Sequence, residues 1–422
     1  MKRASGFSLI ELLVAMTVTL IIVAATLSLF ESALHTNDTT QQLTNMESNL
    51  RSGLNLITRD LLQAGQGIPT GGVPIPSGAG CNNVNRPAPA ATGTQSFPYG
   101  CPVGSNSNLP ALIPGNQMGI TVPSPAAGGG NLGNPNLTWV PSANAKSDIM
   151  TMMYQDNDLV TNIVAATLST NPLVSLSSTS MTFSPAVAVS GAGVSNGVNV
   201  GDIFLISGPN PGSGGGTLNR YVVVTSYTGQ TVKFNAGDVF NLNQQGVAAS
   251  GTVNDFNPNP PGTTFPASCT YGSPWPPNPL PSGCVYTAQR VLMVSYWLDM
   301  SAPINGQAIP RLMRQLGMPP SLASCNGSPP PAGCPRPVAE VIESLELSYD
   351  YVNGTVPVNN EPSTALAAAA CSCSLTDSQI RKVNIYLAGR SDALLAQTGQ
   401  YLRTNMATQV DVRSLAFVNR YH

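Results

Sequence analysis

The chain has 422 residues and a formal net charge of −2, from 20 acidic and 18 basic side chains. This near balance gives no overall field that would attract nucleic acid or anionic lipid. Only 9% of the residues are charged, against about 25% in ordinary soluble domains. With 40 Gly and 37 Pro, the composition is common among exported proteins, and the length allows one large domain with insertions or two to three smaller ones.

The first 30 residues join a short basic leader to a long apolar segment. Lys2 and Arg3 precede this segment, which runs from Phe7 to Phe30 with Glu11 as its only charge. A helix of about 24 residues is about 36 Å long and crosses a bilayer, and basic residues keep its leader on the cytoplasmic side. A carboxylate in hydrocarbon costs several kcal/mol, so Glu11 needs a partner.

A secretory signal peptide is the alternative interpretation of this terminus. Such a signal is cleaved after its apolar segment, at a site of small residues. The segment ends in Ser28-Leu29-Phe30-Glu31, which is a poor site of that kind.

The residues around Gly6 resemble a known processing site. Gly6 to Ala15 reads Gly-Phe-Ser-Leu-Ile-Glu-Leu-Leu-Val-Ala, which is similar to the cleavage and methylation motif of type IV prepilins. In that family a membrane-embedded aspartyl peptidase cuts after the glycine and methylates the new amine. The resemblance implies cleavage between Gly6 and Phe7 and N-methylation of Phe7. It also implies an ion pair between Glu11 and the Phe7 amine of a neighbouring subunit in the filament core.

Helical periodicity continues beyond the membrane segment. No proline lies between Phe7 and Ile68, and Gly53 is the only glycine before Gly65. An apolar face with spacings of three and four comprises Leu43, Met46, Leu50, Leu54, Ile57 and Leu61. We expect one helix of about 58 residues, ending near Gly65. Residues 7–30 would lie in the membrane and filament core, and residues 31–66 would be an amphipathic continuation packed against a head.

Residues 67–147 form a Pro/Gly-rich region. From Gly67 to Ala145 the only charged residue is Arg86. A stretch of this length without regular structure is unusual in a compact domain. We interpret it as an elaborated surface loop with short strands, such as Met118–Val122, and a disordered linker is the alternative.

Residues 148–422 predict a β-rich head. Alternating or β-branched segments predict strands at Asp148–Tyr154, Asp202–Ser207, Tyr221–Tyr227, Thr231–Asn235, Gln289–Leu298, Leu345–Tyr351, Arg381–Leu387 and Val410–Val418. Low-complexity insertions interrupt this head at 254–283 and 319–337. The expected fold class is therefore α+β, with a long N-terminal helix packed on a predominantly antiparallel β head whose long loops are stapled by disulfides. This division resembles the pilin architecture.

Parts of the head are also similar to one branch of prepilins. The similar segments are Val294–Leu298, Arg311–Gln315, Val338–Leu345, Ile380–Leu387 and the end from Val412 to Arg420. They resemble the PilW family of minor pilins, which is related to the J-type minor pseudopilins of type II secretion. In this family Val338–Leu345 corresponds to a helix followed by a strand. The chain is longer than this branch because of its loops, so any added role of the loops stays open.

Eight cysteines are present, at Cys81, Cys101, Cys269, Cys284, Cys325, Cys334, Cys371 and Cys373. The first six form three successive pairs in Pro/Gly-rich segments, and no histidine lies beside them. A metal site would need clustered cysteine pairs or histidine ligands, so disulfides are favoured and no metal is expected. A bond between Cys371 and Cys373 would be strained, so the connectivity of these two stays open.

No catalytic residue is expected. His35 lies just past the apolar segment and His422 is the last residue, so neither provides the base that a nucleophile needs. The Gly212–Gly216 run lacks the Lys-Ser/Thr of a phosphate loop and is interpreted as a hairpin turn. Asp156-Asn157-Asp158 lacks the further oxygen ligands of a calcium loop. The sequence therefore predicts neither an enzyme nor a cofactor.

The resemblance implies a minor pilin that helps initiate or cap assembly of a type IV pilus. The alternatives are a J-type minor pseudopilin of a type II secretion system and a tip-exposed adhesin or DNA-uptake pilin, although sparse Lys and Arg disfavour nucleic acid. Implied partners are the prepilin peptidase, the inner-membrane assembly platform and other minor and major pilins or pseudopilins. The precursor would sit in the inner membrane with its head in the periplasm. The mature subunit would enter a pilus or pseudopilus filament, which in a pilus reaches the cell surface.

The cysteine spacing generates a prediction about disulfides. Cys81–Cys101, Cys269–Cys284 and Cys325–Cys334 each close a short loop, which stabilises a protein by about 2.5 to 3.5 kcal/mol on the chain-entropy model. Peptide mapping without reductant is expected to recover these three linked pairs. Cross-pairing between the three loops, or free thiols, would contradict the sequential arrangement.

Overall fold

The computed structural model of the chain describes residues 8–74, 84–87, 96–99, 108–115, 119, 130–131, 138–139, 146–157, 173–176, 180–183, 197–209, 217–235, 237–243, 287–300, 303–304, 307–318, 325, 333–353, 356–362, 377–395 and 399–416. Several predicted features lie outside these residues. They are Gly6, Phe7, the insertion 254–283, and the cysteines at 81, 101, 269, 284, 371 and 373. The expected strand at Met118–Val122 also lies outside, apart from Gly119.

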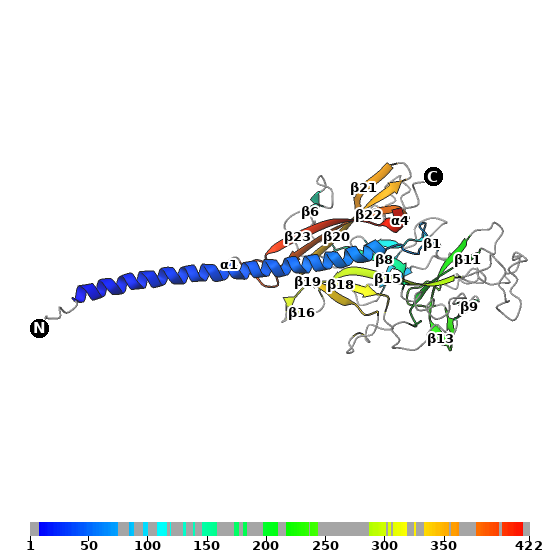
Figure 1. Ribbon diagram of the computed structural model, residues 1–422, viewed down its shortest axis with the longest axis horizontal. Coiled ribbons are helices and arrows are strands. Elements are labelled where there is room, and N and C mark those ends of the chain that lie inside the picture. Colours follow the sequence, from blue (N-terminus) through cyan, green and yellow to red (C-terminus); the bar gives the residue numbers. More distant parts are fainter. Residues whose placement is uncertain are drawn as a thin grey trace, which may run out of the picture.

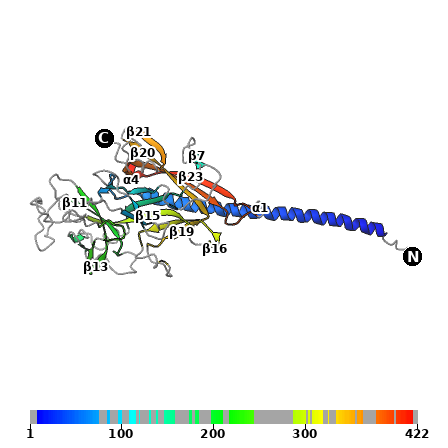
Figure 2. The same cartoon turned by 180° about the vertical axis from the view of Figure 1, so that it is seen from behind.

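A single long helix, α1 (Leu9–Gln63), has 55 residues and confirms the predicted uninterrupted helix. It begins after Ser8, whose hydroxyl oxygen accepts the backbone N–H of Glu11. After its last turn, Gly65 (φ 81°) and Gly67 (φ 72°) adopt left-handed backbone, which glycine tolerates because it has no Cβ. Figures 1 and 2 show the helix projecting far beyond the head, with the chain's N-terminus at its free end.

Only the last third of α1 is buried. The buried residues are Met46, Leu50, Gly53, Leu54, Ile57, Asp60 and Leu61. Their spacing confirms the predicted apolar face from Met46 onward. Leu43, the first predicted member of this face, is still 36% exposed, because the head begins one turn later.

A seven-stranded antiparallel sheet, the central sheet, lies on one side of α1 (Figure 1). It contains β12 (Thr217–Val223), β11 (Ile203–Pro209), β15 (Thr287–Asp299), β18 (Arg311–Leu316) and β19 (Arg336–Glu340) in this spatial order, with β8 (Ile149–Gln155) paired to β15 and β5 (Leu112–Gly115) paired to β8. The 13-residue β15 pairs through its first half with β11 and through its second half with β18. It therefore connects both ends of the central sheet.

A second antiparallel sheet, the C-terminal sheet, lies on the other side of the helix (Figures 1 and 2). Its order is β21 (Val356–Pro362), β20 (Ile342–Asn353), β22 (Ile380–Arg390) and β23 (Arg403–Asp411). The helix contacts β19 at the edge of the central sheet and β22 and β23 of the C-terminal sheet. Helix α1 thus occupies the space between the two sheets.

Smaller elements decorate this framework. An outer sheet has the order β13 (Ser226–Thr228), β14 (Thr231–Lys233), β10 (Ser180–Phe183) and β9 (Leu173–Leu176). Two-stranded pairs join β1 (Val73–Pro74) to β4 (Asn108–Leu109), β2 (Val84–Pro87) to β3 (Ser96–Tyr99), β6 (Gly130–Asn131) to β7 (Thr138–Trp139), and β16 (Pro303–Ile304) to β17 (Gln307–Ala308). A 3-10 helix, η4 (Asp377–Gln379), and a short helix, α4 (Arg413–Ala416), lie near the C-terminus.

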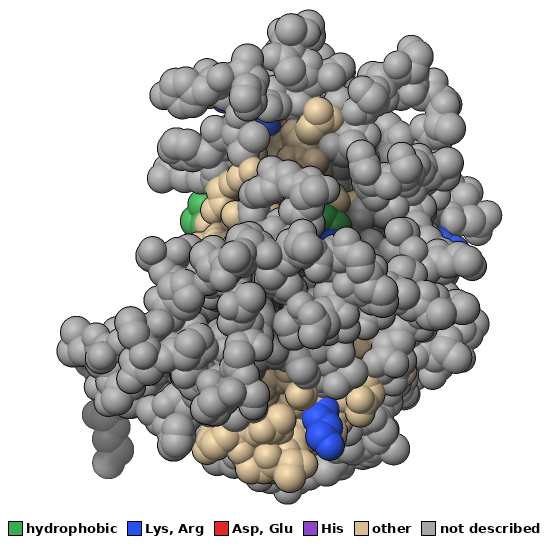
Figure 3. All heavy atoms as spheres, turned by 90° about the vertical axis from the view of Figure 1, so that its right-hand side faces the viewer, with side chains coloured by type: hydrophobic (Ala, Val, Ile, Leu, Met, Phe, Trp, Pro, Cys, Tyr) green, Lys and Arg blue, Asp and Glu red, His purple; other side chains and the backbone are tan. Residues whose placement is uncertain are grey.

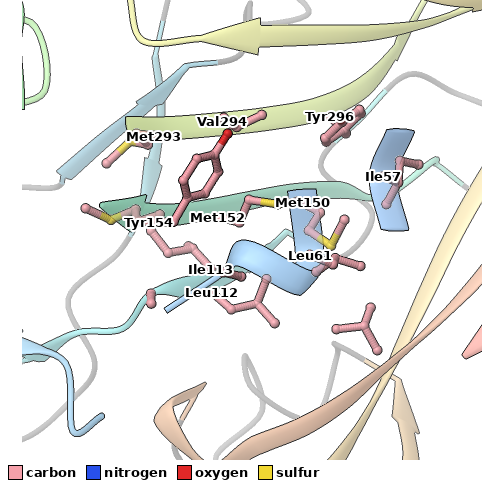
Figure 4. Close-up of a cluster of buried hydrophobic side chains, with 14 of the residues drawn as sticks. Ile57, Leu61, Leu112, Ile113, Met150, Met152, Tyr154, Met293, Val294 and Tyr296 are labelled. Atoms are coloured by element: carbon pink, nitrogen blue, oxygen red, sulfur yellow. The ribbon is translucent and has the colours of Figure 1, made fainter. Parts of the chain in front are cut away.

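The hydrophobic core forms where α1 meets the two sheets. Figure 4 shows Ile57 and Leu61 of the helix beside Met150 and Met152 of β8. Leu112 and Ile113 of β5 lie close by. All of these side chains are fully buried, and each such burial contributes about 1.5–3 kcal/mol. Part of the region 67–147 is therefore core strand, in addition to the surface loop that its composition predicts.

One charged residue lies within the buried face of α1. The Asp60 side chain accepts a hydrogen bond from Arg314 Nε and another from the Tyr296 hydroxyl, both at 2.6 Å. Asp60 is 1% exposed, so its charge is neutralised by the adjacent guanidinium and not by water. The same charge, together with burial as the larger cause, raises the pKa of the nearby Tyr154 hydroxyl.

The predicted strands are largely confirmed. The segments at 148–154, 202–207, 231–235, 289–298, 345–351 and 381–387 correspond to β8, β11, β14, β15, β20 and β22. The predicted strand Tyr221–Tyr227 is wrong as one unit, because the chain leaves the central sheet after Val223 and enters the outer sheet at Ser226. The backbone N–H of Thr225 already donates to Lys233 of the outer sheet.

Two further expectations are corrected near the C-terminus. The strand predicted at Val410–Val418 ends at Asp411, and α4 follows because Val412 and Leu415 turn inward to join the core. The segment Val338–Leu345 is not a helix followed by a strand. It consists of the end of β19, a bend at Val341 (φ 58°) and the start of β20, so it carries the chain from one sheet to the other.

The Cys325–Cys334 disulfide is confirmed, with Cα atoms 5.6 Å apart. It lies between β18 and β19, inside the predicted insertion 319–337. The bond therefore closes the connection between two neighbouring strands of the central sheet, as the sequential pairing predicts.

The packing of α1 predicts the effect of a larger residue at Gly53. A Cβ atom at this position would lie 2.9 Å from Leu312 Cδ2 and 3.4 Å from Ala339 Cβ. We expect Gly53→Val to lower the free energy of unfolding by about 1–3 kcal/mol, because the Leu312 side chain and its neighbours must shift to accommodate the added atoms. Thermal unfolding of the full chain in detergent, followed by circular dichroism, measures this change.

The matched control is Ser52→Val, which adds a similar side chain at an exposed position of the same helix turn. Its effect is expected to stay within about 0.5 kcal/mol. Equal stability of the two variants would contradict close packing of the helix against the central sheet.

Candidate functional site

The free part of α1 is an apolar helix that nothing in the described head covers. Leu9 is 83% exposed, Leu20 72% and Leu29 71%. By length and composition α1 is able to cross a membrane. The apolar stretch that makes this possible is not buried by any described part of the head. Such a large uncovered apolar surface requires lipid or protein around it.

Polar side chains inside this apolar segment are satisfied by the helix itself. The hydroxyl of Thr17 donates to the carbonyl of Val14 at 2.8 Å, and that of Thr19 donates to the carbonyl of Ala15 at 2.7 Å. Thr26 bonds in the same way to the carbonyl of Val23. These bonds leave no unsatisfied hydroxyl donor, so the three threonines are compatible with hydrocarbon.

Glu11 and Ser8 form a reciprocal pair at the start of the helix. The Ser8 backbone N–H donates to Glu11 Oε2 at 3.1 Å, while the Glu11 backbone N–H donates to Ser8 Oγ at 3.3 Å. This capping box satisfies two of the N–H groups that every helix start leaves unpaired. Among the described residues, no basic side chain forms an ion pair with Glu11, so its charge is still uncompensated.

Sequence reasoning identified Glu11 but missed the role of Ser8. The signal was present, because Ser8-Leu9-Ile10-Glu11 has the Ser-x-x-Glu spacing of a capping box just before an apolar run. The helix consequently begins at Leu9, two residues after the predicted new amino terminus at Phe7. Gly6 and Phe7 themselves lie outside the described residues.

Residues 31–45 form a polar connection between the apolar segment and the head. Most of its side chains are exposed, and His35 Nε2 lies 3.8 Å from Glu31 Oε1 one turn away. The hydroxyls of Thr36, Thr39 and Thr40 donate hydrogen bonds to backbone carbonyls of the preceding turn. The free apolar segment and the head are thus separated by about four turns of solvated helix.

The head contains buried acids, but no site for a metal was found among the described residues. Burial raises the pKa of the Glu346 carboxyl to about 9, and the nearby charge of Asp148 adds to this rise. Asp148 accepts the backbone N–H of Leu347, so it joins the start of β8 to the middle of β20. Because Glu346 stays protonated where the unfolded chain would ionise, its contribution to stability falls as pH rises from about 4.5 toward 9.

Basic side chains are sparse on the described surface of the head. Figure 3 views the end opposite the free helix, where uncharged atoms predominate among the described residues and few Lys or Arg side chains show. Inside the head, Arg290 is bound by Asp156 and Asp202, and Arg403 by Glu343. These two arginines are therefore engaged with acids of the head.

Comparison with known proteins matches the terminus alone. Residues 1–27 match the family described as the prokaryotic N-terminal methylation motif. No curated protein and no solved structure gives a significant match to the chain. The matched residues include the basic leader, Glu11 and most of the uncovered apolar helix. The motif, the free helix and the antiparallel β head together support a type IV prepilin-like protein, and they are consistent with anchoring in a membrane by α1 and with assembly among other pilin-type subunits.

Proposed function

We propose that the chain is a minor pilin of the PilW kind, which helps to initiate or cap a type IV pilus after cleavage between Gly6 and Phe7. The observation that carries the proposal is the methylation motif at residues 1–27 on a helix whose apolar half is left uncovered by its own head. The apolar surface of such a helix would be covered by the bilayer before assembly and by a bundle of like helices afterwards. The role is structural, without a catalytic residue or a cofactor.

Glu11 supplies the chemistry of assembly in this proposal. Cleavage after Gly6 would create a positive amine on Phe7, four residues before Glu11 in the chain. Two unlike charges that meet inside an apolar bundle compensate each other, whereas either one alone is costly there. The ion pair therefore selects neighbours that have been cleaved and are positioned in register.

The first test is the processed terminus. In the native host, mass spectrometry of the mature protein is expected to find Phe7 as the first residue, with an N-methyl group. Gly6→Val, which removes the small residue at the cut, is expected to leave the six-residue leader attached. A mature protein that starts at Met1, or after residue 30, would falsify the prepilin function.

The second test separates a pilus from a secretion pseudopilus. Filaments sheared from the cell surface are expected to contain the chain in a few copies each, detected by quantitative mass spectrometry. Loss of the gene is expected to reduce surface filaments and leave protein secretion intact. Lost secretion with normal surface filaments would instead indicate a minor pseudopilin.

A third test concerns the charge of Glu11. Glu11→Val is expected to insert in the membrane at least as well as the wild type but to assemble about tenfold less into filaments, because a neighbour's amine loses its counter-charge. Glu11→Gln retains the hydrogen-bonding shape and is expected to fail equally. The control is Glu31→Gln, at an acid that pairs only with His35 beyond the apolar segment. Normal assembly of Glu11→Gln would show that the charge is not needed.

A further inference from the structure

The C-terminal sheet has an edge strand, β23, that runs beside α1 (Figures 1 and 2). Thr404, near the start of β23, is paired with Gly389, and a Cβ atom at Gly389 would lie 3.4 Å from Met46 Cγ. Beyond the other end of β23, Leu415 Cδ2 would lie 3.3 Å from a Cβ atom at Gly65, just after the helix. The strand therefore runs in the same direction as the helix, from the level of Met46 to the end of α1.

Every second residue of β23 directs its backbone N–H and C=O away from β22. In an antiparallel pair, opposite residues alternate between pairs that exchange both hydrogen bonds and pairs that exchange none. At the two ends of β23, the Ser391 N–H donates to the Leu402 carbonyl at 2.8 Å, and the Val412 N–H donates to the Arg381 carbonyl at 2.9 Å. The register between these ends is unbroken. The even-numbered residues therefore bond to β22, and the odd-numbered residues from 403 to 411 face the open edge.

This open edge is exposed. Asn405, Ala407 and Gln409 are exposed, whereas the even-numbered Met406 and Val410 pack toward the core. Among the described strands, β23 is paired with β22 alone. The short strand β6 contacts β23 but is paired with β7. The outward backbone groups of β23 are therefore accessible to a further strand.

The other edge strands of the two large sheets are protected. Both β19 and β21 have a register shift against their neighbours, and they contain Pro337 and Pro357. The buried strand β5 contains Pro114. At β12, the Asn243 side chain accepts the Val223 N–H at 2.8 Å and donates to the Val223 carbonyl at 2.6 Å. Prolines, irregular register and a covering loop are devices that prevent pairing with another chain.

In contrast, β23 has none of these protections. It is nine residues long, contains neither proline nor lysine, and keeps one register with β22 throughout. An edge of this kind is a template for a further strand, and natural proteins seldom leave it open. The exposed part from Asn405 to Gln409 has no charged residue. It therefore suits an extended backbone with uncharged side chains, which adds to a sheet through main-chain hydrogen bonds.

The direction of β23 identifies the source of the added strand. If two copies of this chain paired antiparallel through β23, their free helices would point in opposite directions and could not enter one membrane. Subunits whose helices lie side by side in one membrane or filament, in contrast, hold their heads side by side. A strand of a neighbouring head is therefore the extended segment that reaches this edge.

We propose that the open edge of β23 pairs with an extended strand from the head of a different pilin-type subunit, so that the C-terminal sheet continues into the neighbouring head. The inference rests on the proposed function and specifies a contact for it within the head. The backbone groups of Asn405, Ala407 and Gln409 provide the hydrogen bonds. The small side chain of Ala407 leaves room for a larger one on the added strand.

A matched pair of variants at Ala407 tests the pairing. Ala407→Pro removes an outward N–H, and the ladder with β22 keeps its bonds because residue 407 does not contribute to it. Ala407→Thr adds as many heavy atoms but retains the N–H. In detergent extracts of the native host, the amount of other pilin-type subunits that co-purify with Ala407→Pro is expected to fall about tenfold, and with Ala407→Thr less than about twofold. Thermal unfolding by circular dichroism checks that both full-length variants retain the fold.

Hydrogen exchange of the wild-type chain provides a second readout that needs no variant. Deuterium uptake is measured at single amides, by mass spectrometry with fragmentation, for the purified chain in detergent and for the co-purified complex. The outward amides of Asn405, Ala407 and Gln409 are expected to exchange at least about tenfold more slowly in the complex. The amides of Met406 and Thr408, which already bond to β22, are expected to change little. This alternation distinguishes strand pairing from a contact through side chains.

The outcomes separate the inference from the proposed function. Failure of any pilin-type subunit to co-purify with the wild type would count against the function itself. If such subunits co-purify but the outward amides exchange equally fast with and without them, or if a folded Ala407→Pro retains them as well as Ala407→Thr does, β23 does not form the contact. If Ala407→Pro fails to fold, the exchange of the wild type decides. Co-purification of a second copy of this chain alone would overturn the assignment to a different subunit.

Discussion

Burial of one face of α1 between two antiparallel sheets is the interaction on which the head depends. The residues from Met46 to Leu61 contact the edge of the central sheet through β19 and the C-terminal sheet through β22 and β23. The two sheets are joined by the bend at Val341, whose carbonyl accepts the backbone N–H of Arg390. Without the helix, the apolar faces of both sheets would be open to water. A Cβ atom at Gly53 would lie 2.9 Å from Leu312 Cδ2, so a larger residue there requires the leucine side chain to shift.

Asp60 fixes the rotation of the helix within this contact. A purely apolar stripe tolerates small rotations, but a buried carboxylate that must meet both Arg314 and Tyr296 does not. Because α1 is one uninterrupted helix, the orientation set at Asp60 extends along its whole length. The direction in which Glu11 points relative to the head is therefore set at Asp60, about 50 residues away along the helix. This coupling gives the free helix and the head a defined relation to each other.

Two acids of α1, Asp60 and Glu11, differ in whether their partners lie within the described chain. Asp60 finds its hydrogen-bond donors and its counter-charge within the same chain, so its site is complete in the isolated subunit. Glu11 finds only the backbone N–H of Ser8. That bond stabilises the helix start but leaves the negative charge uncompensated among the described residues. A counter-charge outside the described residues is therefore needed, which agrees with a helix whose apolar surface is also left uncovered.

Local sequence determined the parts of this protein that depend on neighbouring residues. The absence of proline and the glycines at 65 and 67 determined the length of α1, since a helix is stabilised by bonds four residues apart. The prepilin-like terminus could also be predicted from local sequence, because Gly6, Phe7 and Glu11 lie within one short segment of the chain. The tertiary structure decided what depends on distant partners. It placed Asp60 beside Arg314, and it moved the chain between sheets after Val223. It also turned the expected strand after Asp411 into α4, because Val412 and Leu415 gain more by entering the core than by extending β23. Pattern alone shows that a residue is apolar or β-prone, but only the assembled fold shows which surface it meets.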